Sequence, residues 1–146
     1  MTESPPSAGA ATPATRNSAL RIRAIPVLVL LFAEILVGNQ LAEVGTPYPW
    51  GYLAAHIALS LVLIALTAHA FVLSLHLPSG AARATAGITF LTTLGATVSG
   101  TVFLVAGQNP SALYGMEGLG GVALLGAILL LVVGSVSIPN SPSKTA

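Results

Sequence analysis

The sequence predicts an all-α integral membrane protein, folded as an antiparallel four-helix bundle with both termini in the cytoplasm. Three observations predict this fold: the composition, four apolar runs of spanning length, and the placement of the basic residues. Of the 146 residues, 54% are hydrophobic and only 6% are charged, whereas soluble domains carry roughly 25% charged residues. Charged residues this few are not enough to cover the surface of a water-soluble protein. We therefore expect an apolar surface that faces lipid.

Four apolar runs define a predicted transmembrane domain over residues 21–138. A helix needs about 20 mostly apolar residues to cross the hydrocarbon core of a bilayer. The spans are expected at residues 22–42, 51–75, 84–107 and 119–138. The connections between them are short, which makes neighbouring helices antiparallel. The flanking segments, 1–20 and 139–146, are rich in small and polar residues, and we predict them to be disordered cytoplasmic tails.

Charged and aromatic residues predict the orientation of the bundle. All five basic residues fall on one side of the predicted spans: Arg16, Arg21, Arg23, Arg83 and Lys144. All Trp and Tyr residues fall on the opposite side: Tyr48, Trp50, Tyr52 and Tyr114. Cytoplasmic loops are enriched in Lys and Arg, and Trp and Tyr gather at the membrane–water interface. We therefore expect a multi-pass protein of the cell membrane whose two termini are cytoplasmic.

Composition and motifs exclude several classes of function. The net charge is +1 and no basic cluster is present, which argues against nucleic-acid binding. The chain has no cysteine, so it has no disulfide, thiolate metal site or cysteine nucleophile. The sequence shows no phosphate-binding loop, zinc-protease motif or Ser/His/Asp set. The favoured function is therefore a non-enzymatic structural or accessory subunit of a membrane complex.

Small residues recur at helical spacing in the third and fourth predicted spans. They are Gly95, Ala96, Ser99, Gly100, Gly120, Ala123, Ala127 and Gly134. Such residues let helix backbones approach closely in a membrane, where lipid offers no hydrophobic drive for helix association. They either pack the bundle itself or provide faces for a homo-oligomer or a larger membrane complex.

The second span carries a polar stripe. At 100° per residue, His56, Ser60, Thr67 and Ser74 fall within about 40° of one another on the helix. Polar groups that face lipid are costly, so this stripe is expected to face the interior of the bundle. His69 falls on the opposite side of the same helix.

Glu34 interrupts the apolar run "LLFAEILVG" of the first span. An acid at this depth is expensive, so we expect it to face another helix and to be either protonated or paired. The side chain of His56 lies at nearly the same depth and is one of its few partners. Glu34 serves either as a hydrogen-bonding lock between helices or as a proton-handling group or ligand contact.

His56 allows a second, redox hypothesis. Neutral imidazole is a common axial ligand of haem iron, and Met/His ligation is known chemistry. All three histidines lie in the second span, so a bis-histidine site across two helices is not available. Met116 supplies a thioether at the depth of His56. The alternative function is thus a small redox bundle that holds one b-type haem, or a quinone, through His56, Met116 and Glu34 in its outer half.

Three stretches of the chain carry a resemblance to known proteins. The stretches "FAEILVGNQ", "HIALS" and "ATVSGTVFLVAGQNPSALYGM" resemble a group of small four-span archaeal and actinobacterial membrane proteins without assigned function. This resemblance implies a fold and no activity. The layout is also similar to one four-helix half of haem A synthase and to b-type cytochrome bundles, which implies haem ligation. This chain departs from those proteins because its fourth span has no histidine.

Overall fold

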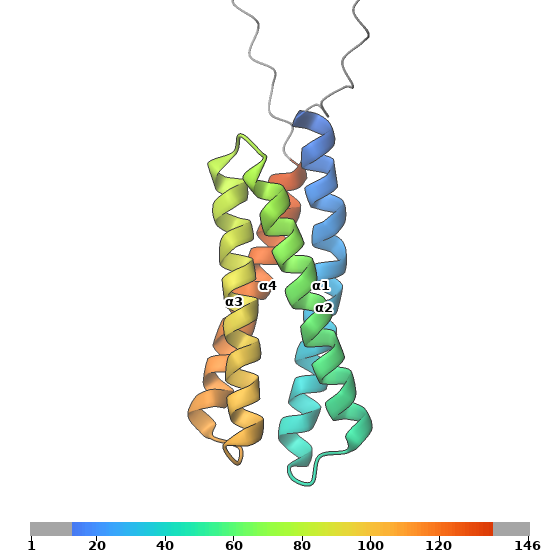
Figure 1. Cartoon of the computed structure of the whole chain (residues 1–146), viewed down its shortest axis with the longest axis vertical. Helices are drawn as coiled ribbons and strands as arrows, with labels where there is room; N and C mark the ends of the chain where they lie inside the picture. Colours follow the sequence, from blue (N-terminus) through green and yellow to red (C-terminus); the bar gives the residue numbers. More distant parts are fainter. Residues whose placement is uncertain (1–12, 136–146) are drawn as a thin grey trace, which may run out of the picture.

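The computed structural model describes residues 13–135, with side chains from residue 18 onward. It contains four helices, α1 (Pro13–Val44), α2 (Trp50–Leu75), α3 (Gly80–Val105) and α4 (Pro110–Ser135). Each helix packs on its neighbours in the chain and α4 packs back on α1, which closes an antiparallel four-helix bundle (Figure 1). The predicted all-α antiparallel four-helix bundle is confirmed, and the cytoplasmic placement of its termini stays a prediction. Residues 1–12 of the expected N-terminal tail and the whole expected C-terminal tail, 139–146, lie outside the described residues, as does the end of the expected fourth span, 136–138. Helix α1 already begins at Pro13.

The surface of the bundle is apolar. Helices α2, α3 and α4 each have the length and composition needed to cross a membrane, since 26 residues rise by about 39 Å. Large hydrophobic side chains lie exposed along the sides of the bundle, among them Phe32, Leu61, Leu91 and Leu125. The chain is therefore a multi-pass membrane protein in contact with lipid. The expected first span, 22–42, lies within α1 and packs along α2 and α4.

Local capping sets where two of the helices begin. The side chain of Asn109 accepts a hydrogen bond from the Ser111 N–H at 2.9 Å, directly before α4, and Pro110 occupies the first helical position, where its missing N–H costs nothing. The side chain of Ser79 accepts in the same way from the Ala82 N–H at the start of α3. Helix α4 thus begins well before its apolar run, so most of the expected connection between the third and fourth spans is helical.

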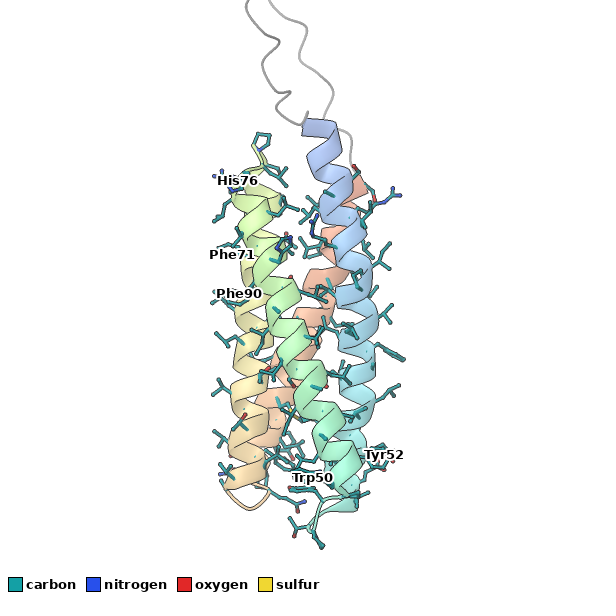
Figure 2. All side chains as sticks on the ribbon, turned by 45° about the vertical axis from the view of Figure 1, so that its right-hand side comes forward. Trp50, Tyr52, Phe71, His76 and Phe90 are labelled. Carbon is teal, nitrogen blue, oxygen red and sulfur yellow. The ribbon has the colours of Figure 1, made fainter. Side chains whose placement is uncertain are left out.

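The two ends of the bundle differ in their side chains. We call the end where α1 begins, α2 joins α3 and α4 ends the tail end, and the end with the α1–α2 and α3–α4 connections the hairpin end (Figure 1). Figure 2 shows Trp50 and Tyr52 at the hairpin end and His76 at the tail end. The tail half has an apolar core, which consists of Leu20, Ala24, Ala70, Leu77, Ala82, Ala86 and Leu130. A second apolar cluster follows toward the middle, made of Val27, Leu31, Leu63, Ala123 and Ala127.

The small residues of α3 and α4 are used inside the bundle. A Cβ added to Gly134 would lie 2.9 Å from the backbone nitrogen of Arg21 on α1. A Cβ added to Gly126 would clash with the Thr89 hydroxyl on α3. Ala123 and Ala127 are fully buried. These glycines and alanines therefore bring α4 against α1 and α3 within one chain.

Candidate functional site

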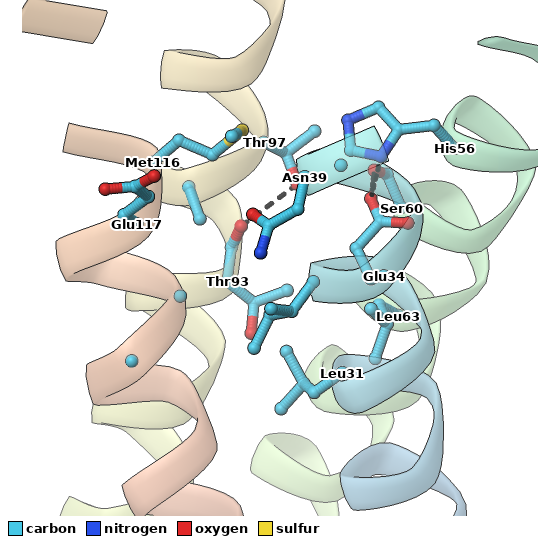
Figure 3. Close-up of a pocket in the computed structure, with 15 residues that line it drawn as sticks. Leu31, Glu34, Asn39, His56, Ser60, Leu63, Thr93, Thr97, Met116 and Glu117 are labelled. Atoms are coloured by element: carbon cyan, nitrogen blue, oxygen red, sulfur yellow. Dashed lines mark hydrogen bonds and ion pairs between the residues drawn. The ribbon is translucent and has the colours of Figure 1, made fainter. Parts of the chain in front are cut away.

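A cavity lies in the hairpin half of the bundle. Toward that end the α1–α2 hairpin separates from the α3–α4 hairpin (Figure 1), and a cavity of about 220 Å³ lies between them, lined by residues of all four helices (Figure 3). Leu31 and Leu63 of the middle cluster line it. Small and apolar side chains make up most of the lining, and a few polar groups are placed among them.

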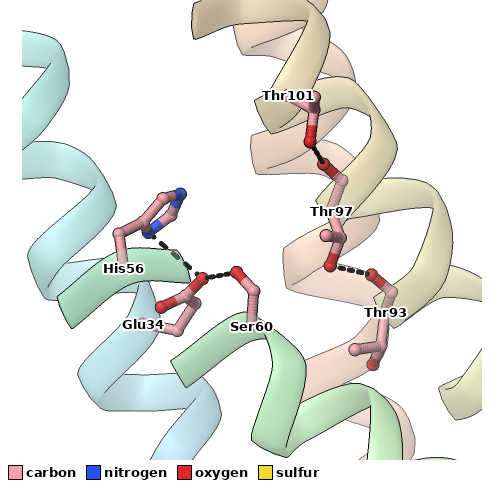
Figure 4. A network of polar contacts seen from close by, with 6 residues as sticks. All are labelled: Glu34, His56, Ser60, Thr93, Thr97 and Thr101. Atoms are coloured by element: carbon pink, nitrogen blue, oxygen red, sulfur yellow. Dashed lines mark hydrogen bonds and ion pairs between the residues drawn. The ribbon is translucent and has the colours of Figure 1, made fainter. Parts of the chain in front are cut away.

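Glu34 forms the polar centre of this cavity. It reaches from α1 to α2, where the Ser60 hydroxyl donates a hydrogen bond to its Oε1. The Nδ1 atom of His56 lies 3.1 Å from the same oxygen (Figure 4). The ring nitrogen is close to the carboxyl group but not aligned for a hydrogen bond, so the contact is electrostatic. The side chains of His56 and Glu34 are only 12% and 15% exposed, and Glu34 faces another helix as predicted.

The predicted polar stripe of α2 faces the interior. Ser60, Thr67 and Ser74 are buried, and His56 stands at its end next to the cavity. The Thr67 hydroxyl donates to the Leu63 carbonyl and the Ser74 hydroxyl to the carbonyl of Phe71, which satisfies both within their own helix. Within the stripe, His56 and Ser60 therefore make the polar contacts with another helix, through Glu34 of α1.

Two glycines make room for the imidazole of His56. A Cβ added to Gly38 on α1 would lie 3.3 Å from the ring Cε1 atom. A Cβ added to Gly100 on α3 would lie 3.1 Å from the Met116 sulfur and 3.9 Å from the ring Nε2 atom. The ring thus lies between the backbones of α1 and α3, with Nδ1 toward Glu34 and Nε2 on the side of Met116. The structure brings together the three residues that the sequence selected.

Some polar atoms of the cavity have no partner. The second carboxyl oxygen of Glu34, Oε2, is buried and makes no hydrogen bond with the described residues. Across the cavity, Thr93 donates its hydroxyl proton to the Thr89 carbonyl at 2.8 Å and Thr97 donates to the Thr93 carbonyl at 3.0 Å (Figure 4). Because these protons are used within α3, the two hydroxyl groups of these lining residues retain only acceptor capacity.

Several lining residues were not selected from the sequence. Thr93 and Thr97 belong to a row of threonines every four residues, which is a signal that the sequence does contain. Gly120 and Gly121 of α4 also line the cavity, and a Cβ on either would meet nothing within 4 Å. Nothing in the sequence distinguishes these two glycines from those that pack helices together.

The rim and the remaining histidines are more exposed. Asn39 on α1 and Glu117 on α4 are exposed and line the cavity. His69 is exposed and His76 lies at the tail end, so neither lines the cavity (Figure 2). Among the described residues, no group of three His, Asp or Glu side chains is arranged to hold a metal ion.

The cavity does not fit a haem. A cavity of roughly 150 Å³ accommodates one benzene molecule, and this one measures about 220 Å³. A haem contains four pyrrole rings, so the macrocycle exceeds the available space. His56 and Met116 do approach the same point beside Gly100, but the helices would have to move apart before both bound one iron atom.

Comparison with models of known protein families, with curated proteins and with solved structures finds no match for this chain. The resemblance to small four-span membrane proteins therefore rests on its short motifs alone. The function has to be inferred from the chemistry of the cavity.

Proposed function

We propose that this chain is a four-span membrane protein that binds a small lipid-soluble molecule, as a non-enzymatic accessory subunit of a membrane complex. The observation that carries the proposal is the cavity into which Glu34 extends, with Oε2 buried and without a partner. A buried polar group without a hydrogen bond costs about 1–3 kcal/mol. A ligand that supplies the missing partner removes this cost and gains affinity from it.

The shape of the cavity supports a binding role. Ligand sites are concave and mostly apolar, with a few polar groups that fix the orientation of the ligand, and in bundles they lie between helices. Here Leu31 and Leu63 provide apolar contacts, and Glu34, Thr93 and Thr97 provide polar ones. The volume, about 220 Å³, suits a molecule with one ring. A quinone head group satisfies this limit and a haem does not.

The polar contacts support binding rather than catalysis. An activated serine needs a general base that accepts its hydroxyl proton. The Ser60 hydroxyl donates to a carboxyl group, which as a class is a weaker base than an imidazole, and His56 contacts the same carboxyl oxygen from its Nδ1 side. The arrangement joins α1 to α2 and presents the carboxyl group of Glu34 to the cavity.

We propose that the tail end is cytoplasmic. Arg21, Arg23 and Arg83 belong to the tail end and Trp50 and Tyr52 to the hairpin end, which follows the usual distribution of these residues.

Single cysteines introduced into this cysteine-free chain test the orientation. Gly80→Cys at the start of α3 has open space around it, and Ser111→Cys is exposed at the start of α4. An impermeant thiol reagent added to intact cells should label position 111 and leave position 80 unlabelled. Labelling of position 80 alone would show that the bundle is inserted the other way round.

Bound molecules can be identified in protein purified in mild detergent, by native mass spectrometry and by the absorption spectrum before and after reduction. Gly120→Leu fills the cavity from α4 and should remove a bound molecule. Gly118→Leu is the matched control, because this glycine also has open space around it but does not line the cavity. Equal ligand content in the wild type and Gly120→Leu would contradict the proposal. A Soret band that is lost in His56→Ala would show that the helices separate to admit haem.

A second candidate function is purely structural. It is favoured by the hydrogen bond from Ser60 to Glu34, which locks α1 against α2. In that case the wild type carries no molecule in the cavity, and Glu34→Leu has the same ligand content as the wild type. Retention of a molecule by the wild type and its loss in Gly120→Leu would exclude this second candidate.

A further inference from the structure

The polar groups of the cavity define the chemistry of its ligand. We infer that the cavity binds a small amine with an apolar body, whose ammonium group lies between Glu34 on α1 and Thr93 and Thr97 on α3. The inference rests on the proposed binding function and adds the class of ligand. Figure 3 shows these side chains around the cavity, and Figure 4 shows Glu34 and the two threonines on opposite walls.

The hydrogen-bonding groups of the cavity are mostly acceptors. Glu34 Oε2 has no partner. The Thr93 and Thr97 hydroxyls have already given their protons to backbone carbonyls of α3, and the Ser60 hydroxyl has given its proton to Glu34. A primary ammonium group carries three N–H donors and no acceptor. It therefore complements three acceptor oxygens on residues of two helices that line the cavity.

The charges near the cavity also favour a cation. The titratable side chains that line it are Glu34 of α1, His56 of α2 and Glu117 of α4, whereas α3 contributes uncharged residues. Among the side chains that the structure describes, the basic residues Arg21, Arg23 and Arg83 are all located in the tail half. A cleft lined by acids in a low-dielectric surrounding attracts positively charged ligands.

The apolar part of the cavity sets the size of the ligand. Leu31, Ile35 and Leu63 line one side, and Ala96 of α3 lines another. The volume of about 220 Å³ accommodates one six-membered ring and a short substituent, since roughly 150 Å³ suffices for benzene. A single-ring amine therefore fills the cavity and places its charged group against Glu34.

A quinone complements the cavity less well than an amine. Its carbonyl oxygens are acceptors, and they would face the acceptor oxygens of Glu34, Thr93 and Thr97. The imidazole of His56 is the buried N–H donor available to it. A ligand that leaves buried polar groups without partners loses affinity, so oxidised quinones should bind more weakly than amines of equal size.

Three probes, each with a single six-membered ring, test the inference on the full-length protein in lipid nanodiscs. Benzylamine carries the ammonium group, benzyl alcohol replaces it with a neutral hydroxyl, and duroquinone represents the quinones. Affinities are measured by ligand-detected NMR titration. We expect benzylamine to bind at least about tenfold more tightly than benzyl alcohol, because charge-assisted hydrogen bonds are roughly twice as strong as neutral ones. Infrared difference spectra should show that the protonated carboxyl band of Glu34, where present, is lost on benzylamine binding.

Two substitutions locate the effect. Glu34→Gln keeps the shape of the side chain and should remove the preference for benzylamine over benzyl alcohol. Thr97→Val keeps the shape of a threonine without its oxygen, and it should weaken benzylamine binding several-fold and leave benzyl alcohol unchanged. This second variant tests the inference even if Glu34→Gln does not fold. Both variants are compared with the wild type by circular dichroism and size-exclusion chromatography.

The outcomes separate the inference from the proposed function. If benzyl alcohol or duroquinone binds as tightly as benzylamine, and Gly120→Leu abolishes that binding, the amine inference is wrong and the binding function stands. If none of the probes binds, or if Gly120→Leu binds all of them like the wild type and the control Gly118→Leu, both are wrong. Selective benzylamine binding that needs Glu34 and is blocked by Gly120→Leu supports both.

Discussion

The tail half and the hairpin half of the bundle use the same four helices in opposite ways. In the tail half, Gly134 brings the backbone of α4 against that of α1, and an apolar core fills the space between the helices. The aromatic rings of Phe71 and Phe90 stack there at a centroid distance of 6.0 Å. In the hairpin half the two hairpins separate, and the space between them is a cavity that polar side chains enter.

This difference shows that small residues have two roles in one helix. At Gly134 and Gly126 a neighbouring helix occupies the space that a side chain would take, which gives close packing. At Gly120 and Gly121 no described residue occupies the space that a side chain would take. The first pair holds the helices together, and the second pair leaves the cavity open.

The largest effect is expected from a charge of the wrong sign in the hairpin half. Glu34→Lys places an ammonium group beside His56 and Ser60, where it loses the hydrogen bond from Ser60. A lysine at the centre of a membrane helix costs about 3 kcal/mol, and we expect the free energy of unfolding to fall by about this amount. Unfolding is followed by circular dichroism during titration with SDS.

The matched control is Glu34→Gln, which retains an acceptor for the Ser60 hydroxyl. It should remain within about 1 kcal/mol of the wild type, the size of one net hydrogen bond. Equal destabilisation by lysine and glutamine would show that the site tolerates no change at Glu34, so the effect would not come from charge.

A smaller effect is expected from filling a packed glycine in the tail half. Gly134→Leu has to push α1 and α4 apart, because its Cβ would lie 2.9 Å from the backbone nitrogen of Arg21. Overpacking of this kind costs about 1–3 kcal/mol, and the same SDS titration measures it. Gly120→Leu in the same helix fills the cavity instead and should cost less than about 0.5 kcal/mol. If both leucines destabilise equally, the two halves do not differ as described.

The smallest expected effect comes from two glycine-to-alanine changes on either side of the cavity. Alanine in a helix is favoured over glycine by roughly 0.5–1 kcal/mol, so Gly121→Ala, in open space, should raise the free energy of unfolding. Gly38→Ala brings a methyl group to 3.3 Å from the His56 ring. This close contact should cancel the gain in the free energy of unfolding that alanine would otherwise give. The NMR shifts of the His56 ring should change in Gly38→Ala alone. An equal gain in the free energy of unfolding of both variants would show that the His56 ring moves aside without loss of stability.

The fold was largely predictable from the sequence because its signals are local. Apolar runs of spanning length indicated the helices, and the short connections between them made neighbours antiparallel. The polar stripe of α2 followed from the 100° rotation per residue, and Ser60, Thr67 and Ser74 are buried as expected. The contact between Glu34 and His56 was anticipated from their similar depth.

Other parts of the site could not be predicted because they depend on how far the helices stand apart. The position of Thr93 and Thr97 opposite Glu34 follows from the order of the four helices around the bundle. The start of α4 depends on the Asn109 cap, which lies well ahead of the apolar run and leaves no mark in the hydrophobic pattern. The cavity depends on the separation of the helices as well as on the glycines that line it, and the positions of the glycines in the sequence do not reveal that separation.

The glycines at 120 and 121 have a consequence for how this protein can evolve. The void beside them exists because two side chains are missing, and a Cβ at either position meets nothing within 4 Å. A single substitution at these positions therefore reduces the space in small steps, from a methyl group upward, without moving a helix. Under the proposed binding function, selection can then adjust the size of the ligand that the cavity accepts, while the packed tail half preserves the fold. The residues that leave the cavity open and those that pack the tail half are separate, so a substitution at position 120 or 121 can change the volume of the cavity at little cost in stability.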